Sequence, residues 1–164
     1  MTGYTDCDWG GSLDDRRSTS GNLFKLGLGA ITWNLKKQDI TALSTTVPEY
    51  VAASTAACQA VWLKRLLSDM GESSAETVQI SCDNKSAIFI AKIPALNGRT
   101  KHIDIKFHLL RSLVADGSIC LKFCSSEEQI ADICTKALPI QKHLFFKALL
   151  GVHSSKSREC VEAD

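Results

Sequence analysis

Several features that would place a protein in a special class are absent from this sequence. It contains no apolar run of about 18 residues, the length needed to cross a bilayer as a helix, and no hydrophobic segment of a signal peptide. We therefore expect a protein that is not secreted, does not span a membrane and works in the cytosol or the nucleus. No internal repeat and no low-complexity linker divides the 164 residues, so we expect one domain over residues 1–151 and a mobile tail over 152–164.

The cysteines show none of the spacings that bind a metal. The 7 cysteines form no C-x-x-C pair, and Cys120 and Cys124 have no histidines at zinc-ligand spacing. An odd number of scattered cysteines in apolar segments indicates buried free thiols in a reducing compartment. We therefore expect no structural zinc and no disulfide framework.

Net charge is also nearly absent. The 19 Lys and Arg residues and the 18 Asp and Glu residues leave a formal charge of +1. This balance excludes a global attraction to polyanions, so any nucleic-acid binding must depend on local basic clusters. Charged residues make up 23% and hydrophobic residues 45%, which is ordinary for a globular protein and excludes a disordered or collagen-like chain.

Hydrophobic periodicity predicts an α/β protein. Alternation and turn signals predict strands near 4–9, 20–26, 30–35, 78–83 and 118–124. Helical spacing predicts helices over 47–70, 84–93 and 141–150, and another between the loop 94–100 and Gly117. The sequence SEEQ at residues 126–129 matches a capping box, which predicts a further helix starting at Ser126.

Four acidic residues lie in four separate predicted elements. They are Asp6 in GYTDCDWGG, Glu49 in STTVPEYVA, Asp83 in ISCDNKSAI and Asp132 in QIADICTKAL. An unpaired buried carboxylate is costly, and a divalent cation is the partner that would use all four. Sites that hold two such cations catalyse phosphoryl transfer or phosphodiester hydrolysis.

The predicted elements give these acids different settings. Asp6 and Asp8 share one strand face and compete for one role, whereas Asp83 follows the carboxyl end of a strand, where ligands bind in open α/β sheets. Glu49 begins a helix that carries no other charge before Lys64, so it is either a buried ligand or a glutamate favoured by the helix dipole. Asp132 lies off the apolar stripe of its helix, which suits either solvent or a cleft.

Eight segments occur along the chain in this order: GYTDCDWGG, DRRSTSG, ITWNLKKQ, ALSTTVPEY, CDNKSAI, RTKHIDI, QIADICTKAL and ALLG. Together with the order of elements, they resemble the ribonuclease H region of copia-type retrotransposon polyproteins over residues 2–151. The resemblance implies a ribonuclease H-like fold, with a five-stranded mixed sheet of order 3-2-1-4-5 flanked by helices. It also implies an endonuclease that hydrolyses the RNA strand of RNA–DNA hybrids during reverse transcription.

The resemblance further implies a two-metal-ion mechanism. Asp6, Glu49, Asp83 and Asp132 would be the catalytic residues and the ligands of two Mg²⁺ ions, with Mn²⁺ as the alternative ion, and Asp8 would support them. One ion would lower the pKa of a water molecule and the other would stabilise the leaving 3′-oxygen. The loop 124–129 lacks the histidine that many cellular ribonucleases H carry before their last aspartate.

A second group of residues would bind the substrate. RNA is distinguished from DNA by 2′-hydroxyl groups in its minor groove, and Asn84 is the polar residue placed beside Asp83 to contact them. Asn84 could equally be only the cap of the next helix. Arg17, Lys37, Lys101 and His102 would contact phosphates, although each alone is more often a solvated surface residue.

The expected partners are an RNA–DNA hybrid and the reverse transcriptase domain of the same polyprotein, and we expect the chain to be monomeric. An alternative is a domesticated retrotransposon-derived module that binds nucleic acid or regulates without catalysis, and the presence of all four acids argues against it. A nuclease or transposase acting on DNA gains no support from the motifs. A glycosyltransferase would depend on the D-x-D of Asp6 and Asp8 alone.

Overall fold

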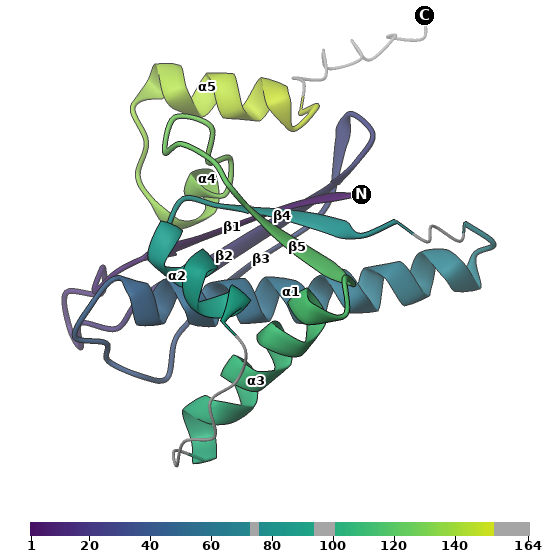
Figure 1. Ribbon diagram of the computed structural model, residues 1–164. Helices are drawn as coiled ribbons and strands as arrows, with labels where there is room; N and C mark the ends of the chain where they lie inside the picture. Colours follow the sequence, from purple (N-terminus) through teal and green to yellow (C-terminus); the bar gives the residue numbers. More distant parts are fainter. Residues whose placement is uncertain (73–75, 94–100, 153–164) are drawn as a thin grey trace, which may run out of the picture.

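A five-stranded mixed sheet forms the centre of the molecule (Figure 1). The computed structural model describes residues 1–72, 76–93 and 101–152, and the side chains of 101–106 lie outside this description. The strands are β1 (Thr2–Asp8), β2 (Thr19–Leu26), β3 (Gly29–Lys37), β4 (Val78–Cys82) and β5 (Ile119–Phe123). Their spatial order is β3-β2-β1-β4-β5, with β1, β2 and β3 antiparallel and β4 parallel to both β1 and β5. The predicted strand order 3-2-1-4-5 is confirmed.

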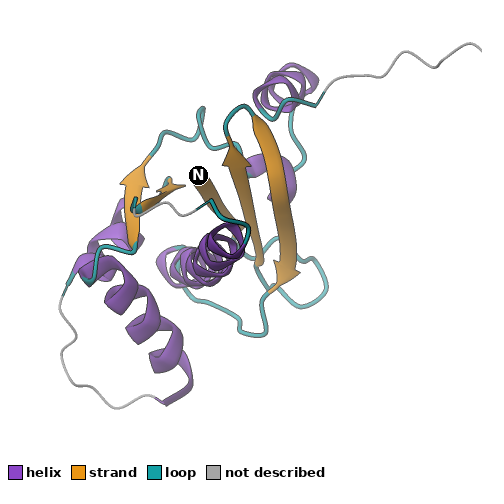
Figure 2. Cartoon of the chain, turned by 90° about the vertical axis from the view of Figure 1, so that its right-hand side faces the viewer, coloured by secondary structure: helices purple, strands orange, loops and turns teal. Residues whose placement is uncertain are grey.

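Helices cover both faces of the sheet (Figures 1 and 2). One face carries α1 (Thr46–Asp69), α2 (Lys85–Lys92) and α3 (Lys101–Ala115), and the other carries α4 (Asp132–Thr135) and α5 (Ile140–Leu149). Each layer has its own core. Phe24, Ile80 and Leu110 are buried under the first layer, and Leu23 and Phe146 under the second, because successive strand residues point to opposite faces.

The long helix α1 is the element that carries Glu49 into the interior. Its buried side is built from small residues, and Ala53, Ala56 and Ala60 are each 0% exposed, which lets the helix lie close to the sheet. At its first turn the Tyr50 ring stacks on Phe107 of α3 with 4.1 Å between centroids, and the Tyr50 hydroxyl donates to the Phe107 carbonyl oxygen at 2.9 Å. The start of α1 is therefore held between the sheet and α3.

One predicted helix start is wrong. No helix begins at Ser126, and α4 begins only at Asp132. The Ser126 hydroxyl instead donates to Asp83 at 3.3 Å. The preceding Ser125 donates through its backbone N–H and its hydroxyl to Glu128, which closes a turn. Gln129 is 0% exposed and donates to the Thr5 carbonyl oxygen at 2.9 Å, so the chain turns inward where a helix would have run along the surface.

Within the described residues, no helix is long and apolar enough to cross a bilayer. The six cysteines of these residues are free thiols. Cys7, Cys82 and Cys124 are buried as predicted, but Cys58 and Cys120 are exposed. Cys120 alternates with the buried Ile119 and Leu121 of β5 and therefore points to the other side of the strand. The predicted loop 94–100 and residues 153–164 of the predicted tail lie outside the described residues, so the domain limits stay a prediction.

Candidate active site

Asp6 and Asp83 lie side by side at one edge of the sheet. β1 and β4 are parallel, and their last residues in register are Tyr4 and Ser81, so Asp6 and Asp83 each follow two residues further on. Asp6 is 0% exposed and Asp83 is half-buried. Burial raises the pKa of Asp83, and the neighbouring Asp6 raises it further. Two carboxylates that repel each other across adjacent strands form the centre of the site.

Glu49 adds a third carboxylate from the first turn of α1, where its backbone N–H donates to the Thr45 carbonyl oxygen at 3.2 Å. The side chain is 7% exposed, and no described residue forms a hydrogen bond with its Oε2. Burial raises the pKa of Glu49 to about 9, with further contributions from Asp6 and then Asp83. Glu49 thus lies in the first turn of its helix and is also buried beside other carboxylates, so its role as a metal ligand stays a prediction.

Asp132 is the fourth carboxylate, and it is buried instead of facing solvent. It is the first residue of α4 and is 3% exposed. Its charge contributes to the raised pKa of Asp83, which places it near the other acids. The four predicted carboxylates thus come together from β1, α1, the end of β4 and α4.

A glycine lets α4 approach the sheet closely enough for this arrangement. Gly21 on β2 lies opposite Asp6 in the β1–β2 register. A Cβ atom at Gly21 would lie 2.5 Å from Cγ2 of Thr135 and 3.2 Å from Cβ of Cys134, so no side chain fits there without a shift. The close contact brings the Thr135 hydroxyl to Asp6, to which it donates a hydrogen bond.

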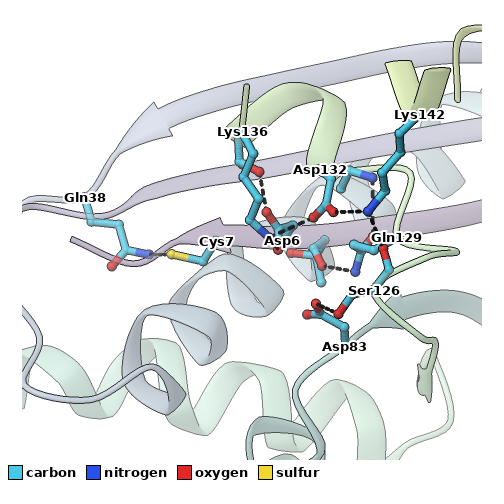
Figure 3. Close-up of polar contacts among 12 residues, drawn as sticks. Asp6, Cys7, Gln38, Asp83, Ser126, Gln129, Asp132, Lys136 and Lys142 are labelled. Carbon is cyan, nitrogen blue, oxygen red and sulfur yellow. Dashed lines mark hydrogen bonds and ion pairs between the residues drawn. The ribbon is translucent and has the colours of Figure 1, made fainter. Parts of the chain in front are cut away.

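Two lysines that were not predicted also enter the site (Figure 3). Lys136 Nζ lies 3.0 Å from Oδ1 of Asp6 and 2.8 Å from Oδ1 of Asp132. Lys142 Nζ lies 3.2 Å from Oδ2 of Asp132 and donates to the Ser126 carbonyl oxygen at 2.9 Å. Burial alone would lower the pKa of Lys136, but its bonds to Asp132 and Asp6 outweigh this and raise it. Residues four apart on a helix face each other, so the spacing of Asp132 and Lys136 could have predicted their ion pair. Nothing in the sequence connects Lys142 with Asp132.

The donor atoms fit a hard cation on one side of the site. One ligand atom each of Glu49, Asp83 and Cys82 lie within 4.8 Å of one another. Burial raises the pKa of the Cys82 thiol to about 12. Carboxylate oxygens suit Mg²⁺ or Mn²⁺ better than sulfur does, so Glu49 and Asp83 are the ligands of choice for such an ion. The unpartnered Oε2 of Glu49 would gain a partner from such a cation. On the other side, between Asp6 and Asp132, the ammonium group of Lys136 is the counter-charge.

The predicted substrate-binding residues lie in different settings. Asn84 caps α2, because its Oδ1 accepts a hydrogen bond from Ala87 N at 2.9 Å. Arg17 and Lys37 both pair with the exposed Asp15, at 3.6 and 2.9 Å. Lys101 and His102 begin α3, and their side chains lie outside the described ones.

Lys37 lies at the same end of the strands as the carboxylates. Thr19, the first residue of β2, is the register partner of Asp8 on β1 and of Lys37 on β3, so β1 and β3 end beside the start of β2. A hollow of about 320 Å³ lies beside this edge, and Lys36, Lys37 and Gln38 line it together with residues of α1. The four carboxylates do not line this hollow, so it is separate from the cluster.

Sequence comparison finds relatives that are much longer than this chain. The chain is 42% identical over 155 residues to the Retrovirus-related Pol polyprotein from transposon TNT 1-94 of Nicotiana tabacum, covering 94% of this chain and 12% of the relative. It is 34% identical over 149 residues to the corresponding polyprotein from transposon RE1 of Arabidopsis thaliana, covering 91% of this chain and 10% of the relative. The chain thus spans about a tenth of the length of these two polyproteins. No protein-family model matches it.

Solved structures with the same fold are ribonucleases H. The N-terminal RNase H domain of rv2228c from Mycobacterium tuberculosis has a TM-score of 0.55 at 10% identity, covering 90% of this chain and 97% of that one. LC11-RNase H1 in complex with an RNA/DNA hybrid has a TM-score of 0.53 at 12% identity, covering 78% of this chain and 87% of that one. At these identities the likeness establishes the fold, which is ribonuclease H-like as expected.

Proposed function

The chain is homologous over most of its length to a segment of copia-type retrotransposon Pol polyproteins and has a ribonuclease H-like fold, and from this premise we propose that it hydrolyses the RNA strand of RNA–DNA hybrids. The observation that carries the proposal is the convergence of Asp6, Glu49, Asp83 and Asp132 at one edge of the sheet. The reaction would serve reverse transcription, with the reverse transcriptase domain of the same polyprotein as a partner.

The electrostatics of the carboxylates support a metal-dependent reaction. Burial and mutual repulsion raise the pKa values of Glu49 and Asp83, so both would gain from a cation. The four carboxylates would together hold two Mg²⁺ ions, with Glu49 on the side of one and Asp132 on the side of the other, and Mn²⁺ could replace them. When bound, the ions would supply activation of a water nucleophile and stabilisation of the leaving 3′-oxygen.

The remaining residues would hold the hybrid. Asn84 adjoins Asp83, and the half of its side chain that does not cap α2 could contact a 2′-hydroxyl group. Lys37 and Arg17, at the same edge, would contact phosphates after leaving Asp15. The hybrid bound by LC11-RNase H1, a protein of the same fold, supports this choice of substrate.

The test compares the wild-type chain with Asp83→Asn on labelled RNA–DNA hybrid, duplex DNA and single-stranded RNA, each with Mg²⁺ and with chelator. We expect metal-dependent cleavage of the hybrid alone, and loss of at least about 100-fold in rate for Asp83→Asn because a metal ligand is removed. Asp69→Asn, at the far end of α1 and exposed, is the matched control and should cleave normally. Wild-type cleavage by Asp83→Asn would contradict the assignment.

One observation favours a second candidate, a domesticated module that binds nucleic acid without catalysis. The oxygens of Asp132 are already bound by Lys136 and Lys142, as in a site that has exchanged a metal ion for lysines. Hybrid binding without cleavage in the same assay, at any Mg²⁺ or Mn²⁺ concentration, would support this candidate.

A further inference from the structure

The carboxylate cluster has two unequal halves. In the half formed by Asp6 and Asp132, every carboxylate oxygen is bound: Lys136 binds Oδ1 of both, Thr135 donates to Oδ2 of Asp6, and Lys142 binds Oδ2 of Asp132. In the half formed by Glu49 and Asp83, the Ser126 hydroxyl donates to Oδ2 of Asp83, and no described residue bonds Oε2 of Glu49.

We propose that Lys136 is a built-in counter-ion for the Asp6–Asp132 half of the site, and that a divalent cation held by these two aspartates must first displace its ammonium group. The proposal rests on the proposed function only for the identity of the metal. Lys136 is a positioning residue in this scheme, because it acts on the carboxylates and takes no part in bond breaking.

The ammonium group of Lys136 and a divalent metal ion cannot occupy the Asp6–Asp132 half together, for geometric and electrostatic reasons. The ammonium nitrogen lies 3.0 Å from Asp6 and 2.8 Å from Asp132, so it stands between the two oxygens that a shared metal ion would use. Mg²⁺ binds carboxylate oxygens at about 2.0–2.1 Å, which would bring a divalent ion into close contact with a like charge. One of the two must leave.

Lys136 is able to leave, whereas Lys142 is held more firmly. The Lys136 side chain is 36% exposed, and its four-carbon stem can turn its charged end into solvent. The Lys142 side chain is 22% exposed, and it also bonds the Ser126 carbonyl oxygen and lies over the Phe146 ring at 5.3 Å. Lys142 would therefore stay at Oδ2 of Asp132 while Lys136 exchanges with the metal.

This arrangement predicts two metal positions of different affinity. The Glu49–Asp83 half has no lysine bond to lose and would fill first. The Asp6–Asp132 half would fill at a higher metal concentration, because each binding event breaks two charge-assisted hydrogen bonds of Lys136. Without the lysine, the carboxylates of this half would repel each other in the metal-free protein and bind a cation more readily.

The test measures Mn²⁺ binding in the absence of nucleic acid, by electron paramagnetic resonance of the free ion, for the wild-type chain and Lys136→Met. We expect the weaker site to bind Mn²⁺ about tenfold or more tightly in Lys136→Met, because the competing bonds are gone. Lys136→Arg keeps the charge and should bind as the wild type does. Lys92→Met, which removes an exposed lysine of α2, is the matched control and should also be unchanged.

Thermal unfolding gives a second, independent readout. In chelator Lys136→Met should unfold at a lower temperature than the wild type, and Mn²⁺ should raise its midpoint by more. If Lys136→Met does not fold in chelator, Lys136→Gln, which keeps a hydrogen-bond donor, takes its place in both measurements. Equal or weaker Mn²⁺ binding by a folded Lys136 variant without the charge would overturn the proposal.

The two proposals fail in different ways. If the wild-type chain cleaves hybrid but neutral Lys136 variants bind Mn²⁺ no more tightly, the counter-ion role is refuted and the proposed function stands. If these variants bind Mn²⁺ more tightly but the wild-type chain cleaves no hybrid, the counter-ion role is supported and the proposed function fails.

Discussion

Replacing Glu49 with glutamine should make the metal-free protein more stable at neutral pH. The ordinary pKa of this side chain is 4.5, and in the folded protein burial and the nearby Asp6 and Asp83 raise it to about 9. Between these values the folded state keeps a proton that the unfolded chain releases, so stability is lost as pH rises from 4.5 through 9. At pH 7 the difference is 7 − 4.5 = 2.5 pKa units, or about 3.5 kcal/mol at roughly 1.4 kcal/mol per unit. Glutamine has the shape of the protonated acid and carries no such dependence.

The assay is urea unfolding followed by circular dichroism, in chelator, from pH 5 to pH 9. Glu49→Gln should be more stable than the wild type by about 3.5 kcal/mol at pH 7, which corresponds to a midpoint about 7–14 °C higher in a thermal scan. The difference should shrink to about 1 kcal/mol at pH 5, because the unfolded chain, with its ordinary pKa of 4.5, regains the proton only below that pH. Glu127→Gln, which removes an exposed carboxylate, is the control and should show no such trend.

Two outcomes would refute this reasoning. A stability difference between Glu49→Gln and the wild type that stays constant across the pH range would show that Glu49 does not titrate with a raised pKa. A less stable Glu49→Gln at pH 7 would show that the charged carboxylate is compensated in the fold. Added Mg²⁺ should reverse the order, stabilising the wild type more than the variant, since the variant lacks a ligand.

Three further substitutions test other parts of the site. Gly21→Ala places a methyl group 2.5 Å from Cγ2 of Thr135 and should displace α4. We expect a loss of about 1–3 kcal/mol in thermal unfolding and slower hybrid cleavage, and unchanged values would show that α4 tolerates the contact. Gln129→Leu leaves the buried carbonyl oxygen of Thr5 without its donor and should cost about 1–3 kcal/mol in urea unfolding, whereas an equal midpoint would argue against that bond. Asn84→Ser keeps a helix cap and should change stability by less than about 0.5 kcal/mol. Weaker hybrid binding by this variant would reveal a substrate contact, whereas unchanged binding would show that Asn84 serves only as the cap of α2.

The elements that could be predicted are those whose periodicity is set by burial. The uncharged stretch after Glu49 lies in a helix predicted over 47–70, and α1 forms there and packs between the sheet and α3. The alternation around Asp6 predicted its strand face, and the strand before Asp83 ends where expected. In each case the signal extends over several residues, so one ambiguous position does not change it.

The parts that could not be predicted depend on single long-range contacts. The capping box at Ser126 is a local pattern, and it fails because the Ser126 side chain is used by Asp83 and the Gln129 side chain by Thr5. Lys142 reaches Asp132 from another helix, and no spacing along the chain records that contact. A local sequence pattern is compatible with more than one structure of a segment, and tertiary contacts select the structure that forms.

The contacts that close the site join the two ends of the described chain. Gln129 bonds Thr5 across 124 positions, and Lys136 bonds Asp6 across 130. Closing so long a loop costs chain entropy, which the docked segment from Gln129 to Lys142 must offset with its own contacts. Three of the four carboxylates lie on the sheet and α1, whereas the fourth is placed only when this segment docks. Metal affinity at the Asp132 side would therefore report whether the segment is docked, and during synthesis this side could not form until the ribosome had passed residue 142.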